Sequence, residues 1–584
     1  MRVRVRKPLL RVLVLVILLS FSAGLVSAQP NYVISNSQDW RDVYSTQLYA
    51  NLIGSKPYFL VSMRHSTLLL NQLAKGPNVS ALVVSSSRLP YVINYASMLS
   101  TVGIPAEELN VYSANLELAS RLNVTNFIVL DDNYGYNAIS VAPYAVVKRA
   151  YVLFADRNNI DEVVRFLSTR DRVDELIIYG IVDREVVDSL QGFNPVIINK
   201  GDRFSDNVEI VKRYQAIKHA KQAVLTNGEF IEREIMSGEE PVIFIGRNNV
   251  PDVVRDYIKD SEIEIGVLIG NDLVGTATFV RRTLGISVFV KFAQSARNPR
   301  GPISRVEALD MFNVPKVKVD IDIAGIAYNT ATGLIEVTYQ NLEDIATFLK
   351  GTITLTSEQG ERQVVGDTEP IFLDPSGIKT LTYEVDRFAG ENLSARAFVI
   401  YGEAPNSLEF VIDKKMGVSK ISVLDKARVN VTGVWYDWGK RGFLVEVENI
   451  GDVDCFVDIE LRELKIGYNI VNLGLEQPAR LKVGEKKRLR ISTDEEILPE
   501  DIDKNKIVKL RVYYGERENA LVNMLESDFV LAEISKNYLV WILVGVAVLV
   551  LLLLLLLKFR VKCEQCGHKN LLFRSHCSKC GAKL

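Results

Sequence analysis

The chain has 584 residues, which is too long for one hydrophobic core and indicates about three to five domains. Its 69 basic and 71 acidic residues leave a formal net charge of −2, which gives no global reason to expect nucleic acid or a strongly acidic partner. A hydrophobic content of 48% and a charged content of 24% are ordinary for globular domains.

The first 28 residues are typical of a signal peptide. A cationic start, "MRVRVRK", precedes an apolar run, "PLLRVLVLVILLSFSAGL", and the small residues Val26-Ser27-Ala28 suit signal peptidase. The alternative is an uncleaved N-terminal anchor. Residues 1–28 are therefore predicted to direct export and to lie outside the fold.

Residues 29–300 show apolar strands that alternate with helices. The clearest stretch has a strand "PVIFIG" (241–246), a helix "VPDVVRDYIKD" (250–260) and a strand "IGVLIGN" (265–271). Apolar strands separated by helices predict a parallel sheet covered on both faces. The pattern recurs at intervals of about 90 residues, which predicts a triplicated α/β head. Its units are expected at about 32–122, 123–215 and 216–298.

Two segments of this head are similar to type 2 cell wall binding repeats. "GDRFSDNVEIVKRY" (201–214) resembles the family's Gly-Asp-Arg helix, and "AVLTNGEFIEREIMSG" (223–238) resembles its strand, turn and following helix. In the first unit, "NVYSANLELASRL" (110–122) replaces the Gly-Asp-Arg element. The resemblance implies three small α/β units and contact with an anionic wall polymer.

After the head, the sequence predicts two tandem β-sandwiches. Short runs with period-2 alternation are separated by turn residues. Tyr328 aligns with Tyr436, and Asn341 aligns with Asn449, at the same spacing in the chain. Both asparagines are expected to turn the chain. The two modules resemble CARDB-type immunoglobulin-like modules, and their predicted bounds are 316–415 and 425–532.

The segment "YLVWILVGVAVLVLLLLLLL" (538–557) has no charged residue. A helix of this length would span about 30 Å, the thickness of a bilayer's hydrocarbon core. Lys558, Arg560 and Lys562 follow it. The sequence therefore predicts a single-pass protein of the cell membrane, with the lipid bilayer as a partner, residues 29–537 extracellular and residues 558–584 cytoplasmic. This order of modules resembles archaeal surface-layer-type proteins.

The C-terminal residues 558–584 contain two Cys-x2-Cys pairs, each followed by glycine. In a reducing compartment this spacing is typical of two knuckles around one tetrahedral zinc. The segment resembles the small zinc-ribbon family, which implies structural Zn²⁺; redox-active or metal-free thiols are the alternative. The predicted ligands are Cys563, Cys566, Cys577 and Cys580. The remaining cysteine, Cys455, is expected to be a buried small hydrophobe.

Other candidate sites lie in the predicted exported part. Asp202, Arg203 and Asp206 are candidates for a polymer or inter-repeat contact, with a structural salt bridge as the alternative. Asp131-Asp132 at a strand end could hold a cation or act as a base, although helix capping is the commoner role. Four Asn-x-Ser/Thr sequons are candidate glycosylation sites: Asn78, Asn123, Asn392 and Asn430.

No HExxH, GxSxG or P-loop motif occurs in the sequence, which disfavours an enzyme. The leading hypothesis is a non-enzymatic, membrane-anchored surface protein of the S-layer or envelope type. Its head would contact copies of itself or an envelope polymer. The alternative is a single-pass receptor or solute sensor whose zinc ribbon recruits a cytoplasmic protein. Neither hypothesis includes a nucleic-acid partner.

Overall fold

The fold is described by a computed structural model. The described residues are 29–76, 78–298, 305–386, 392–493, 495–534, 545–552, 554, 560–571 and 574–584. The predicted signal peptide (1–28) lies outside them. The chain forms two compact units: residues up to 425 make up most of the first, and most residues from 426 onward belong to the other.

Within the described residues, the N-terminal region holds three four-stranded parallel sheets with one common strand order. In each sheet the first strand lies between the second and the third, and the fourth is at the edge. The first sheet contains β1 (Tyr32–Asn36), β2 (Lys56–Phe59), β3 (Ala81–Ser86) and β4 (Ala106–Val111). The second contains β5 (Asn126–Leu130), β6 (Ala150–Phe154), β7 (Glu175–Tyr179) and β8 (Val196–Ile198). The third contains β9 (Gln222–Thr226), β11 (Val242–Phe244), β12 (Ile265–Ile269) and β13 (Ser287–Lys291).

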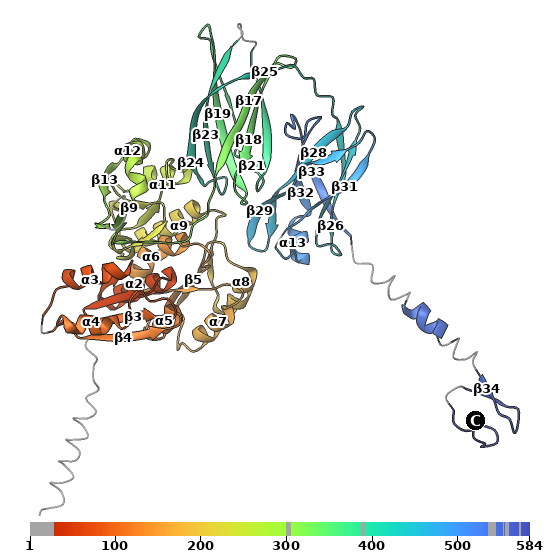
Figure 1. The fold of residues 1–584 in the computed structure, drawn as a ribbon, viewed down its shortest axis with the longest axis horizontal. Coiled ribbons are helices and arrows are strands. Elements are labelled where there is room, and N and C mark those ends of the chain that lie inside the picture. Colours follow the sequence, from red (N-terminus) through yellow and green to blue (C-terminus); the bar gives the residue numbers. More distant parts are fainter. Residues whose placement is uncertain are drawn as a thin grey trace, which may run out of the picture. The chain divides into compact units, whose positions relative to one another are not determined.

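Helices connect the strands of each sheet, as Figure 1 shows in red to yellow-green. Those of the first unit are α2 (Trp40–Ile53), α3 (Met63–Gln72), α4 (Tyr95–Thr101) and α5 (Ala114–Ser120). The second has α6 (Tyr136–Lys148), α7 (Ile160–Ser168), α8 (Arg184–Leu190), η1 (Gln191–Phe193) and α9 (Arg203–Ile217). The third has α10 (Arg233–Met236), α11 (Asp252–Asp260), η2 (Asn271–Thr276) and α12 (Ala277–Leu284). The prediction of an α/β region with parallel sheets is confirmed.

Most residues of the central strands are buried because helices pack against the sheets, and the edge strand β6 is buried as well. Every residue of β1, β3 and β6 is buried. One continuous apolar cluster runs from Val33 in the first unit to Leu284 in the third. The helices α2, α6 and α10, which occupy the same place in their units, contact one another. The three units therefore share one core.

A buried asparagine joins each of the first two units to the next sheet. Asn115 of α5 donates to Val152 O at 2.9 Å and accepts from Phe154 N at 3.2 Å, both on the edge strand β6. Asn207 of α9 does the same on the edge strand β11. A side-chain amide thus satisfies backbone groups that an edge strand would otherwise leave without partners.

The rest of the chain up to residue 534 is β-rich, as predicted, and is drawn in green to blue in Figure 1. Short strands first connect the two regions: β10 (Phe230–Glu232) pairs with β16 (Met311–Asn313), and β14 (Ser295–Asn298) pairs with β15 (Arg305–Ala308).

The first β module comprises residues 321–421 and contains two sheets, β22-β18-β17-β25 and β20-β19-β23-β24 with β21 on β19. Its strands are β17 (Ile321–Asn329), β18 (Leu334–Asn341), β19 (Thr347–Ser357), β20 (Arg362–Gly366), β21 (Ile371–Leu373), β22 (Ile378–Glu384), β23 (Leu393–Gly402), β24 (Leu408–Gly417) and β25 (Ser419–Ile421).

The second β module comprises residues 429–534, and its strands are ordered β29-β28-β32-β33-β26-β27-β31, with β30 on β28. The strands are β26 (Val429–Asp437), β27 (Gly442–Asn449), β28 (Cys455–Ile466), β29 (Asn469–Gly474), β30 (Ala479–Leu481), β31 (Lys486–Ile491), β32 (Ile507–Gly515) and β33 (Asn523–Ile534), with one helix, α13 (Pro499–Lys504). Cys455 is fully buried, as expected for a small hydrophobe.

Asn341 and Asn449 have the same structural role in the two β modules. Asn341 Nδ2 donates to Ile345 O at 2.8 Å, and Asn449 Nδ2 donates to Val453 O at 2.8 Å. Each Oδ1 accepts from the backbone N–H two residues further on. The aligned asparagines therefore hold equivalent turns.

The prediction of a membrane-spanning helix at 538–557 is wrong for the part of the chain that can be described. Within that segment, residues 545–552 form a helix, and apart from Leu554 the rest lies outside the described residues. None of the described helices combines the length and the apolar character needed to cross a membrane. The predicted single-pass topology and the two compartments assigned from it are therefore not supported.

Candidate functional site

The four C-terminal cysteines lie on two turns with the same hydrogen-bond pattern. The strands on either side of the first turn, β34 (Arg560–Lys562) and β35 (Lys569–Leu571), pair with each other. In the first turn, Gly567 N donates to Cys563 O at 2.8 Å. In the second, Gly581 N donates to Cys577 O at 3.0 Å. Both glycines have φ near +70°, a left-handed conformation that glycine adopts without steric cost.

The two turns bring all four sulfur atoms within 4.8 Å of one another. Cys563 Sγ lies 3.6 Å from Cys580 Sγ, and Cys566 Sγ lies 3.5 Å from Cys577 Sγ. Four sulfurs bound at about 2.3 Å to one tetrahedral ion stand about 3.8 Å apart. The predicted ligands therefore come together, and the site could hold a metal ion.

Asn570 supports this cluster, although the sequence analysis did not single it out. Its side chain is buried and donates to Cys577 Sγ at 3.4 Å, while its Oδ1 accepts from Ser578 N at 3.0 Å. The backbone N–H of Lys579 also points at Cys577 Sγ and lowers the pKa of this thiol to about 5. Donors aimed at a sulfur stabilise its thiolate form, which is the form that binds a metal.

The structure places the predicted contact residues Asp202, Arg203 and Asp206 in the interior of the first compact unit. Asp202 caps α9 by accepting from Phe204 N and Ser205 N. Asp206 accepts from Lys200 N at 2.6 Å, and burial raises its pKa to about 7. All three side chains are buried. A polymer contact at these residues stays a prediction.

Arg203 is held by partners that lie some 200 residues further along the chain. Its Nη2 donates to Glu409 Oε1, and its Nε lies 3.2 Å from Glu403 Oε1. Its guanidinium group lies over the Tyr136 ring, 4.2 Å from the centroid. Both glutamates come from the β23–β24 connection and the start of β24. No local sequence pattern indicates this contact.

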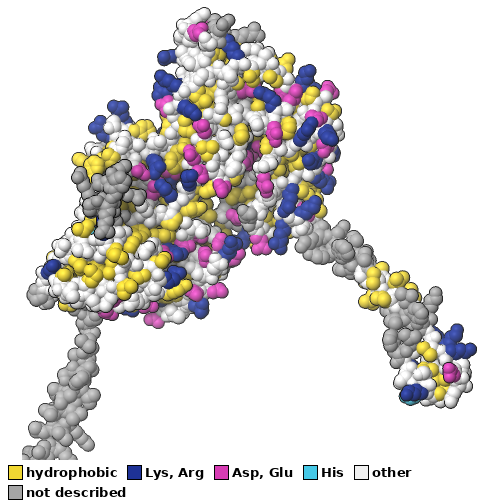
Figure 2. Space-filling view, in the orientation of Figure 1, with side chains coloured by type: hydrophobic (Ala, Val, Ile, Leu, Met, Phe, Trp, Pro, Cys, Tyr) yellow, Lys and Arg dark blue, Asp and Glu magenta, His cyan; other side chains and the backbone are white. Residues whose placement is uncertain are grey.

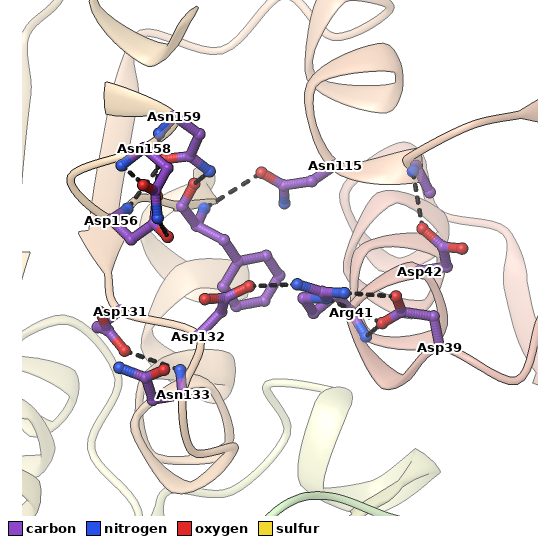
Figure 3. Close-up of polar contacts among 12 residues, drawn as sticks. Asp39, Arg41, Asp42, Asn115, Asp131, Asp132, Asn133, Asp156, Asn158 and Asn159 are labelled. Carbon is purple, nitrogen blue, oxygen red and sulfur yellow. Dashed lines mark hydrogen bonds and ion pairs between the residues drawn. The ribbon is translucent and has the colours of Figure 1, made fainter. Parts of the chain in front are cut away.

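The acidic pair at the end of β5 makes separate contacts, as Figure 3 shows. Asp131 accepts from Asn133 N at 2.7 Å, and burial raises its pKa to about 6. Asp132 bonds Arg41 Nη1 at 2.6 Å, and Arg41 also binds Asp39. The Asp132–Arg41 ion pair joins the first unit to the second, and the Asp131 bond holds a local turn. Both aspartates therefore have structural roles.

A small cleft of about 180 Å³ lies where the third unit meets the first. Its lining includes Tyr58 and His65 from the first unit and Glu232 from the third. Lys291, which also lines it, lies 2.7 Å from Glu232 and 2.8 Å from Glu234. Polar and charged groups therefore converge here from elements far apart in sequence.

The asparagines of all four sequons are exposed: Asn78, Asn123, Asn392 and Asn430. They are accessible to modification, and their glycosylation stays a prediction. Figure 2 shows acidic and basic side chains interspersed on the visible face of the larger part of the molecule, in keeping with the net charge of −2. No one-sign patch dominates that face.

Comparisons with known proteins identify no family. No family model and no curated protein matches the chain. Among solved structures, red sea bream transglutaminase matches at 11% identity with a TM-score of 0.13, covering 42% of this chain and 38% of that one. The E. coli chaperone DraB matches at 12% identity with a TM-score of 0.13, covering 36% of this chain and 96% of that one. Likeness at this level carries no argument about fold or function.

Proposed function

We propose that the C-terminal module is a structural zinc ribbon. The observation that carries the proposal is the sulfur cluster, with edges of 3.5 and 3.6 Å between two matching turns. Cys563, Cys566, Cys577 and Cys580 would hold the ion. Four protein ligands leave no open coordination position, so the ion would supply folding energy rather than catalysis.

Zinc release from the purified full chain tests this proposal. Modification of the thiols should release one zinc ion per chain, and Cys577→Ser should abolish the release. Cys455→Ser is the matched control, because Cys455 is buried in the second β module and should leave the zinc content unchanged. A preparation whose C-terminal thiols all react without releasing metal would contradict the assignment.

We further propose that the α/β region is a binding module, not an enzyme. It would make lateral contacts with other copies of the chain or contacts with an extended anionic polymer, and the two β modules would form a stalk of tandem β-sandwiches. The three repeated units support this role, because repeated weak sites on one rigid body multiply their affinity for a repetitive ligand.

Sedimentation of the full chain tests the binding role. Either concentration-dependent assembly or cosedimentation with a purified anionic polysaccharide is expected. A chain that remains monomeric and does not cosediment would contradict it.

A second candidate function is recognition of a small solute, and the cleft between the third and first units favours it. Its volume of about 180 Å³ is below the usual range for drug-sized ligands, so only a small polar solute would fit. Thermal stabilisation by such a solute should be lost in Lys291→Met. Lys221→Met is the control, because Lys221 forms an exposed pair with Glu264 elsewhere in the third unit. No stabilisation across a panel of amino acids, sugars and nucleosides would exclude this function.

A further inference from the structure

The first β module packs on the edge of the α/β region where open sheets usually bind ligands. That edge lies beyond the carboxyl ends of the parallel strands. Gly135, which follows β5, donates to Pro315 O at 3.1 Å. Asn248 N and Asn249 N, which follow β11, donate to Glu409 O at 3.3 and 3.1 Å. The β module therefore covers the ligand edge of the third sheet, and the segment that leads into the module, residues 314–317, covers the end of β5 in the second sheet.

Two glycines allow close approach, Gly135 to the segment that leads into the β module and Gly246 to the module itself. A Cβ atom at Gly135 would lie 2.3 Å from Val314 Cβ, and one at Gly246 would lie 2.5 Å from Glu409 Cβ. Neither glycine has a positive φ, so the close approach rather than the backbone conformation excludes a side chain. Glycine at these two positions therefore allows the docked arrangement, which a larger residue would obstruct.

The contact buries more negative than positive charge. Arg203 of α9 faces both Glu403 and Glu409. Glu229, which follows β9, repels the carboxylate of Glu409. It forms an ion pair with Lys316 at 2.6 Å and lies 3.8 Å from Arg247. The ring of Tyr136 in α6 faces the guanidinium group of Arg203. Asp202, which caps α9, repels the carboxylate of Glu403. One carboxylate therefore lacks a balancing cation when both glutamates are ionised.

We propose that this contact is a pH-operated latch, closed when Glu409 carries a proton and weakened when Glu403 and Glu409 are both ionised beside Arg203. Opening would uncover the carboxyl end of β11. The latch goes beyond the proposed binding role, because it controls access to one edge of the α/β region whatever ligand that edge takes.

The direction of the pH effect follows from the buried position of Glu409. Burial raises its pKa to about 7 in the docked state, while an exposed glutamate titrates near 4.5. The docked state therefore binds the proton more tightly, and docking weakens as the pH rises. Between pH 6 and pH 8 the equilibrium should shift about tenfold toward the open state.

Hydrogen exchange in the full chain tests the latch, read from the amides of Asn248 and Asn249 after correction for intrinsic exchange at each pH. In the wild type, their protection should fall about tenfold from pH 6 to pH 8. Glu409→Gln should keep the pH 6 protection at pH 8. Glu403→Gln should also keep the pH 6 protection at pH 8, because the single negative charge of Glu409 then balances the single positive charge of Arg203.

Two further variants separate the latch from general effects. Asp413→Asn changes an exposed acid on the same strand, β24, and should leave the pH response as in the wild type. Gly246→Ala should reduce protection at both pH values because its Cβ strikes Glu409. Corrected protection that stays constant from pH 6 to pH 8 in the wild type, or that falls equally in Glu409→Gln and Glu403→Gln, would overturn the proposal.

Discussion

The C-terminal module and the α/β region reach a defined structure in opposite ways. Within its described residues, the C-terminal module has one short hairpin and few buried side chains, and its order centres on four sulfur atoms. The α/β region buries a continuous apolar cluster across three sheets and places polar side chains at its junctions. The first should therefore depend on an ion and the second on packing and hydrogen bonding. Changes that affect one should leave the other intact.

Metal removal should have the largest effect and should be confined to the C-terminal module. Zinc binding contributes on the order of 10 kcal/mol to the folding of small ribbons, so a chelator should unfold the module completely. Hydrogen exchange should then show loss of protection at the amides of Gly567 and Gly581, which donate within the two turns. Amides of β6 and β11 in the same sample are the control and should stay protected. If both glycine amides stay protected without metal, the C-terminal module does not depend on an ion for its fold.

Loss of a junction asparagine should have the next largest effect, now confined to the α/β region. Asn207→Ala leaves Phe244 N–H and Val242 C=O without this partner, which should cost about 3 kcal/mol of unfolding free energy. Urea denaturation of the full chain measures the change.

Asn158→Ala is the matched control for that substitution. Asn158 is exposed and bonds Asp156 within one loop, so its loss should change the unfolding free energy by less than about 0.5 kcal/mol. Equal effects of the two substitutions would show that the junction does not stabilise the α/β region.

The smallest expected effect, taken per pH unit, is a pH dependence of opposite sign in the two regions. Burial raises the pKa of Asp206 to about 7, above its ordinary 3.8. The folded state then binds the proton more tightly, so stability is lost as the pH rises from about 4 to about 7, by at most about 1.4 kcal/mol per pH unit. The C-terminal module should instead lose stability as the pH falls, because metal ligands must be deprotonated.

Unfolding midpoints of the α/β region between pH 5 and pH 8 measure this dependence. Asp206→Asn should make the curve less steep, while Asp131 and Glu409, whose pKa values burial also raises, keep part of the slope. Asp413→Asn, an exposed acid, should leave the curve unchanged. A midpoint that rises with pH in the wild type and in Asp206→Asn alike would contradict the assigned sign.

Features that depend on local sequence could be predicted. The apolar strand runs and the 90-residue recurrence predicted parallel α/β units, and the Cys-x2-Cys-Gly spacing predicted the sulfur cluster. Both depend on residues close together in the chain. The equivalence of Asn341 and Asn449 was also visible, because one repeat spacing relates them and their turns are local.

Features that depend on distant partners could not be predicted. Arg203 pairs with Glu403 and Glu409, some 200 residues away, so its identity alone did not show whether it faces a polymer or the chain itself. Asn115 was missed because the Gly-Asp-Arg element is absent from the first unit. Its Ser-x-Asn sequence, shared with Asn207, was the available signal. Hydropathy alone predicted a membrane-spanning helix that no described helix matches.

X-ray absorption at the zinc edge of the purified full chain tests the central claim most directly. A metal-held C-terminal module predicts one shell of four sulfur atoms at about 2.3 Å around the ion. The shell should disappear in Cys577→Ser and persist in Cys455→Ser. A shell of nitrogen or oxygen atoms, or a chain that binds no zinc with all four C-terminal thiols reduced, would contradict it.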